Sequence, residues 1–112
     1  RVPHDADRVA DILAALYFRV LRIRPEAVGM DRDAFVQALK DENIGTGIHY
    51  RPAHIHAFYR DYYTQNPQAL PPEGLPHSEW SGDRLLSLPL WPGLTEADQD
   101  QVVAAIRQVL KR

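Results

Sequence analysis

Proline placement constrains the fold of this chain more than any other feature of its sequence. Nine prolines are spread over 112 residues, and each one disfavours a helix interior or a central strand. Four of them, with one glycine, lie in residues 65–76, which we predict to form a loop with polyproline II character. Strand-like and helical segments alternate between these breaks. We therefore expect an α+β fold, in which a small, mostly antiparallel sheet has helices packed on one face.

Hydrophobic periodicity predicts where the individual elements lie. Strands rich in β-branched and aromatic residues are expected at residues 16–23, 44–50 and 87–90, the last at a sheet edge because it contains a proline. Helices are expected at residues 5–16, 31–42, 53–63, 77–86 and 95–110. Asp31 is a favourable N-cap, and Thr95 with Asp98 forms a capping-box pattern at the last helix. The apolar stripe of that helix comprises Val102, Val103, Ile106, Val109 and Leu110.

Composition excludes several classes of function. Thirteen Lys and Arg residues against fifteen Asp and Glu give a net charge of −2, which is not the positive charge expected of a general nucleic-acid binder. The chain has no cysteine, and this excludes disulfides, a thiolate nucleophile and a zinc–thiolate site. No apolar run approaches the roughly 20 residues of a membrane span. The length fits one domain, and the absence of an initiator Met suggests a piece of a longer protein.

The densest cluster of polar side chains lies in residues 49–60. Three histidines, His49, His54 and His56, fall within eight residues, a pattern that invites a metal site. On a helix, however, residues two apart point about 200° away from each other, and the i, i+4 histidines of helical zinc proteases are absent. We therefore assign no metal ligands and interpret these histidines as polar lining, although His49 with a distant carboxylate stays open as a ligand pair.

Arginines and tyrosines alternate through the same segment. Arg51 and Arg60, with Tyr50 and three further tyrosines nearby, are residue types that hold phosphates and stack on bases. The alternative that we favour is a helix whose aromatic side chains lie in the core while its arginines face solvent.

A convincing nucleophile is missing. The two lysines, Lys40 and Lys111, lie near a helix end and near the chain terminus, not in the apolar setting that would lower an amine pKa for Schiff-base chemistry. We therefore assign no catalytic residue. The sequence reads as a module that faces a substrate, without the groups of a complete catalyst.

Two blocks of sequence resemble a known family. The first is Ile44-Gly45-Thr46-Gly47-Ile48-His49-Tyr50-Arg51-Pro52-Ala53-His54 with Phe58-Tyr59-Arg60, and the second runs from Leu75 to Glu96. Both resemble the C-terminal domain of the pyridoxal-phosphate-dependent nucleotide-sugar aminotransferases, the DegT/DnrJ/EryC1/StrS type. The resemblance covers residues 16–110 and is strongest to the members that make UDP-4-amino-4-deoxy-L-arabinose for lipid A modification. Residues 1–14 match less well, which leaves the N-terminal boundary open.

The resemblance implies a role for the chain within a larger protein. Residues 1–112 would be the small C-terminal domain of a fold-type-I aminotransferase, whose large domain is absent here and holds pyridoxal phosphate on a lysine. The parent would be a cytoplasmic, homodimeric transferase that moves an amino group from glutamate to a 4-keto nucleotide sugar, a UDP-4-keto-pentose of lipopolysaccharide synthesis. Neither lysine matches the Schiff-base motif, so this chain alone would bind no cofactor and be inactive. His49, Tyr50 and Arg51 match the segment that faces the nucleotide sugar.

A second class of function stays open from the residues themselves. The chain could be a free-standing ligand-binding or protein-interaction module, using its histidines for a metal or Arg51 and Arg60 for phosphates. The strand at residues 17–23 would then expose the face that otherwise packs on a large domain, which favours dimerisation. Neither function involves nucleic acid or a membrane span.

Overall fold

A computed structural model of the chain describes residues 19–111, and the helix expected at residues 5–16 lies outside them. The elements are two strands, five α-helices and two 3₁₀ helices (η). In chain order they are β1 (Arg19–Arg22), α2 (Pro25–Val28), α3 (Arg32–Asp41), η1 (Ala53–Ile55), α4 (Ala57–Gln65), η2 (Pro67–Ala69), α5 (Pro76–Gly82), β2 (Leu85–Leu88) and α6 (Glu96–Leu110).

β1 and β2 form an antiparallel pair whose register separates two faces. Leu21 lies opposite Leu86, and Val20 lies opposite Ser87. Because residues directly opposite each other point to the same face, Leu21 and Leu86 share the face toward the core. Val20 and Ser87 share the other face, which we call the open face, and Val20 is exposed there.

Two helices cover the core face of the sheet. α3 packs against both α6 and β2, and the fully buried Phe35 of α3 lies at their junction. The buried core comprises Ile23, Phe35, Leu39, Leu86, Ala105 and Val109. The expected α+β architecture, with a small antiparallel sheet and helices on one face, is therefore confirmed.

The helix bounds follow local signals where such signals exist. The Asp31 carboxylate accepts from the backbone N–H of Ala34 at 2.8 Å, as its N-cap position predicts. α2 was not expected, although Pro25 at its first turn and Gly29 after its end, with φ +78°, are the residues that favour such a short helix. In α6, Ala105 is buried, whereas Val103 of the expected apolar stripe is exposed.

Two strand predictions are wrong. The second strand covers residues 85–88 instead of 87–90, because α5 already ends at Gly82 and Leu85 pairs with β1. As expected, it is an edge strand, since the sheet has two strands only. On the side opposite β1, Ser87 alone exchanges both backbone hydrogen bonds with Gly47, at 2.7 and 3.0 Å. That single bridge is all that forms of the strand expected at residues 44–50. Two glycines leave this segment few side chains to pack on a neighbour.

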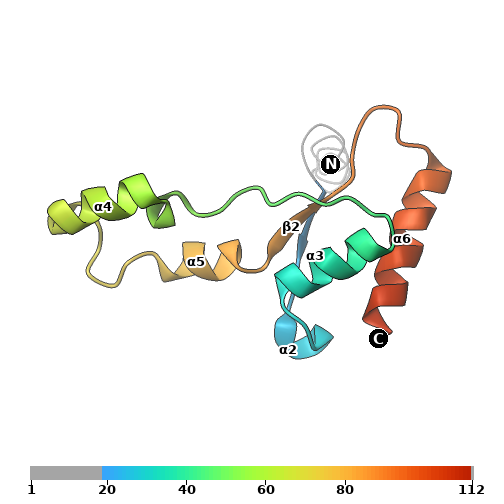
Figure 1. Cartoon of the computed structure of the whole chain (residues 1–112), viewed down its shortest axis with the longest axis horizontal. Coiled ribbons are helices and arrows are strands. Elements are labelled where there is room, and N and C mark those ends of the chain that lie inside the picture. The colour runs from blue at the N-terminus through green and yellow to red at the C-terminus, as the bar shows by residue number, and fades with distance from the viewer. Residues whose placement is uncertain (1–18, 112) are drawn as a thin grey trace, which may run out of the picture.

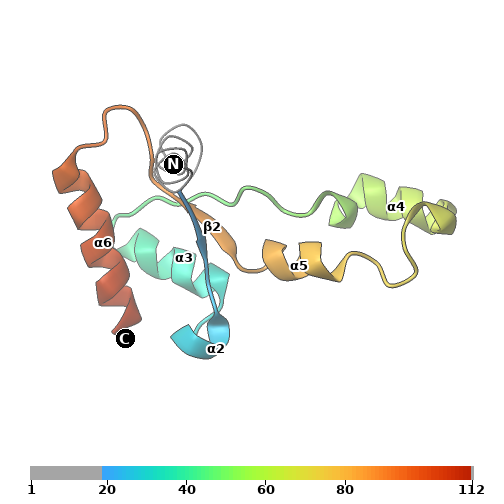
Figure 2. The same ribbon diagram turned by 180° about the vertical axis from the view of Figure 1, so that it is seen from behind.

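The helix expected at residues 53–63 is interrupted. It begins as η1, breaks at His56, whose backbone is extended at φ −69° and ψ 147°, and resumes as α4. The chain has already left the core before this break. Figure 1 shows α4 and α5 projecting away from the sheet, α3 and α6, and the view from behind in Figure 2 agrees. We call residues 51–82 the arm. The radius of gyration is 17.6 Å, against about 13 Å for a compact chain of this length.

Three contacts tie the two limbs of the arm to each other and to the core. A Cβ added to Gly82 would lie 2.5 Å from two ring carbons of Pro52, so the limbs touch where the arm begins. His54 Nε2 lies 2.9 Å from Glu79 Oε1, which joins η1 to α5. From α3, Arg32 Nη1 donates to the carbonyls of Gly82 at 2.7 Å and Leu85 at 3.2 Å. The arm is therefore anchored at its base and exposed at its tip.

The capping box expected at the last helix is present. The Thr95 hydroxyl accepts from Asp98 N at 3.1 Å, and the Asp98 carboxylate accepts from Thr95 N at 3.0 Å. The pKa of the Asp98 carboxyl is lowered from 3.8, because first the backbone N–H and then the side chain of Thr95 hydrogen-bond to its ionised form. A carboxyl whose pKa is lower in the folded chain stabilises the fold above about pH 4 and loses that contribution as the pH falls through the folded-state pKa.

We expect Asp98→Asn to remove this acid dependence. Urea titrations from about pH 6 to about pH 2 should show that the free-energy difference between the parent chain and the variant is largest at high pH and shrinks on acidification. Asp100→Asn changes an exposed carboxylate slightly further along the same helix. It is the control and should keep the pH profile of the unsubstituted chain. A pH-independent difference for Asp98→Asn would contradict a role for its ionised form.

Candidate functional site

The predicted site residue His49 lies over the open face of the sheet in a seat formed by two other residues. Its Nδ1 lies 2.9 Å from the hydroxyl of Ser87. Its ring also lies so close to Gly47 that a Cβ there would be 2.5 Å from His49 Cε1. The imidazole is half-buried. A ring held by a hydrogen bond on one side and by backbone on another has little freedom to rotate.

Tyr50 and Arg51 continue from this ring into solvent. Tyr50 packs edge-on against His49, with ring centroids 4.9 Å apart and planes at 89°, and it is 73% exposed. Arg51 is also exposed, and its carbonyl oxygen lies 3.3 Å from His56 Nε2. The three predicted residues therefore lie next to each other, with one fixed ring and two accessible side chains.

A second cluster, which sequence reasoning missed, joins the strand pair to the base of the arm. The guanidinium carbon of Arg84 lies 4.6 Å from the Trp80 ring centroid, and that of Arg22 lies 5.3 Å from it. Neither arginine has a carboxylate within ion-pair distance among residues 19–111. The only sequence signal was the position of Arg22 in a strand with charges on both faces, and nothing local indicated that Trp80 would lie beside it. Guanidinium groups stacked on an indole keep their N–H groups available for an anion.

The three histidines of residues 49–56 do not converge. His49 bonds to Ser87, His54 to Glu79 and His56 to the Arg51 carbonyl. Between residues 19 and 111 no group of three His, Asp or Glu side chains is placed to hold a metal ion. The described structure therefore gives no support to the alternative of a histidine metal site.

The aromatic side chains of α4 are not core residues, so the interpretation favoured from the sequence is wrong. No residue of α4 is buried, and Phe58 is 73% exposed. The reason is the arm itself, which carries this helix beyond the reach of the sheet (Figure 1). Arg60 lies on α4 with Asp61 Oδ1 3.6 Å from its Nε, whereas Arg51 precedes η1. The two arginines that the sequence analysis grouped therefore belong to different segments of the arm.

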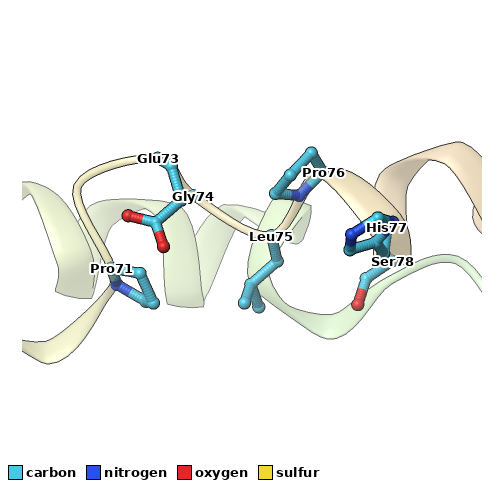
Figure 3. A pocket seen from close by; sticks show the side chains of 7 residues that line it. All are labelled: Pro71, Glu73, Gly74, Leu75, Pro76, His77 and Ser78. Atoms are coloured by element: carbon cyan, nitrogen blue, oxygen red, sulfur yellow. The ribbon is translucent and has the colours of Figure 1, made fainter.

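A pocket of about 280 Å³ lies elsewhere, in the loop that enters α5. Figure 3 shows its lining, with prolines and Leu75 around the Glu73 carboxylate and His77 at one end. Its lining is mainly apolar and includes none of His49, Tyr50 or Arg51. A lone carboxylate among prolines would repel the phosphates of a nucleotide, so we do not place the site here.

The described residues do not fit a covalently held pyridoxal phosphate. Lys40 lies exposed in the last turn of α3 and Lys111 lies exposed after α6, so neither amine has the shielded setting that activates a Schiff-base lysine. Within residues 19–111, no helix is both long enough and apolar enough to cross a membrane.

Comparisons with known proteins match nearly the whole chain. The model of the DegT/DnrJ/EryC1/StrS aminotransferase family matches residues 2–107. The crystal structure of a DegT DnrJ EryC1 StrS aminotransferase from Brucella abortus is similar at 29% sequence identity and a TM-score of 0.61. That alignment covers 98% of this chain and 30% of the other. The chain thus spans under a third of the length of this relative.

Proposed function

Because the chain belongs to the DegT/DnrJ/EryC1/StrS aminotransferase family, we propose that it is the small C-terminal domain of a pyridoxal-phosphate-dependent aminotransferase. The parent would take the amino group of glutamate, which leaves as 2-oxoglutarate, and place it on the carbonyl carbon of a 4-keto nucleotide sugar. When bound, the cofactor supplies the electron sink for this exchange. The lysine that holds it belongs to the rest of the parent, since Lys40 and Lys111 are exposed.

The observation that carries the proposal is the fixed His49 ring beside accessible Tyr50 and Arg51 on the open face. A sugar nucleotide offers hydroxyls, a diphosphate and a flat base. An imidazole hydrogen-bonds to hydroxyls, a guanidinium binds phosphate oxygens through two N–H groups, and a phenol ring stacks on a base. Arg22 and Arg84 add positive charge at the same end of the arm. This chain would enclose the substrate and contribute no catalytic group.

The finer assignments follow from sequence resemblance and are proposals of the same kind. The amino-acid sequence of residues 44–60 and 75–96 favours a UDP-4-keto-pentose of lipid A modification as substrate, a homodimeric parent protein and a cytoplasmic location. The opposing possibility, a binding module without catalysis, would share the nucleotide contacts but not the need for glutamate or for a lysine-bearing domain.

Nucleotide binding by this chain tests the substrate-facing role. We expect amide shifts at residues 45–51 when UDP or a UDP-sugar is titrated to millimolar concentration. His49→Ala should weaken the UDP-sugar response by about threefold to tenfold, the range for one net hydrogen bond, whereas His77→Ala should not. Shifts confined to residues 71–78, or a loss of binding in His77→Ala alone, would place the ligand in the other pocket and contradict the proposal.

A further inference from the structure

Ser87 stands out as the only buried polar side chain among residues 19–111, at 4% exposure. A buried hydroxyl costs free energy unless it finds a hydrogen-bond partner. Ser87 finds one in His49 Nδ1, 2.9 Å away and 38 residues earlier in the sequence.

The backbone of Ser87 is fixed from both sides. Its N–H donates to the Gly47 carbonyl at 2.7 Å, and its carbonyl accepts from Gly47 N–H at 3.0 Å. On its other side it lies opposite Val20 in the β1–β2 pair. The hydroxyl therefore projects, at the open face, from a residue that has a neighbouring backbone segment on each side.

Gly47 completes the seat by leaving room for the ring. The imidazole occupies the space that a side chain at position 47 would need, since an added Cβ would approach Cε1 to 2.5 Å. The same glycine whose backbone holds Ser87 thus accommodates the ring that Ser87 binds. Gly45, two residues earlier, has nothing within 4 Å of an added Cβ, so the need for glycine is specific to position 47.

We propose that Ser87 is the positioning residue of His49: its hydroxyl holds Nδ1 and, with Gly47, fixes the orientation of the imidazole. Whether the hydroxyl donates or accepts, Nδ1 is committed to it. A substrate over the open face would then meet the ring in one orientation. This last step rests on the proposed function, whereas the seat itself does not.

The direct test is the ¹⁵N spectrum of the imidazole of His49 at about pH 8, where an ordinary histidine is neutral. In the parent chain the Nδ1 resonance should be displaced by its hydrogen bond to the Ser87 hydroxyl. Ser87→Ala should shift this resonance, and Ser87→Thr, which keeps the hydroxyl, should restore its position. Gly47→Ala should also change the spectrum, with Gly45→Ala as its matched control. Unchanged His49 shifts in Ser87→Ala or in Gly47→Ala would overturn the proposal.

A second readout links the seat to the ligand. Ser87→Ala should weaken the UDP-sugar response about threefold to tenfold, as expected for one hydrogen bond, and Ser87→Thr should recover most of it. If Ser87→Ala does not fold, Gly47→Ala against Gly45→Ala decides the question. If the parent chain binds no nucleotide, the proposed function loses its support here, while the imidazole spectra still decide the role of Ser87.

Discussion

Replacing Phe35 by alanine should lower the free energy of unfolding by about 3–5 kcal/mol, the cost of emptying a large buried aromatic site. Phe35 is fully buried in α3, among core residues that come from β2, from α6 and from the position just after β1. Domains of this size have a total stability of about 5–15 kcal/mol. The change therefore removes a large share of the total stability, and the urea midpoint measured by circular dichroism should fall sharply.

Phe58→Ala is the matched control, because it deletes the same side chain from the exposed surface of α4. Phe58 is 73% exposed, so the change should cost no more than about 0.5 kcal/mol. Comparable losses for both variants would mean that the arm is packed against the core, contrary to Figures 1 and 2. Comparable small losses would mean that the core does not depend on Phe35.

Local chemistry explains which parts of the fold could be predicted. The caps at Asp31 and Thr95 satisfy backbone groups within three residues of themselves, so the sequence contains the whole interaction. The core face of α3 follows from 3.6-residue periodicity for the same reason. The α+β class follows from the alternation of these local elements.

Long-range contacts explain what could not be predicted. Residues 44–50 have the composition of a strand, yet whether a strand forms depends on a partner, and here only Gly47 finds one. No proline or glycine at or next to His56 indicates the break in the helix at this residue. It coincides with the contacts of Pro52 and His54 to α5, which lies about 25 residues further along the chain.

The residues of the candidate site also differ in whether their contacts are local or long-range in the sequence. His49, Tyr50 and Arg51 are adjacent in the chain, so a resemblance of one short segment was enough to select them. Ser87 lies 38 residues from His49, and Trp80 is separated from Arg22, which it contacts, by an even longer stretch of sequence. Burial of the α4 aromatics was the wrong inference because composition cannot show that a helix leaves the core. Sequence reasoning selected the segment, and the structure adds the residues that hold His49 in place, Ser87 and Gly47.

The most direct test of the central claim is transamination by a longer protein of which these residues, as we propose, form the C-terminal domain. With glutamate and a UDP-4-keto-pentose, we expect 2-oxoglutarate and the amino sugar in equal amounts, and neither product from residues 1–112 alone. His49→Ala should lower kcat/KM about threefold to tenfold, mainly through KM, because it removes binding that substrate and transition state share, while His77→Ala should match the unsubstituted protein. Full-length protein that makes no amino sugar, or activity in the isolated chain, would contradict the assignment.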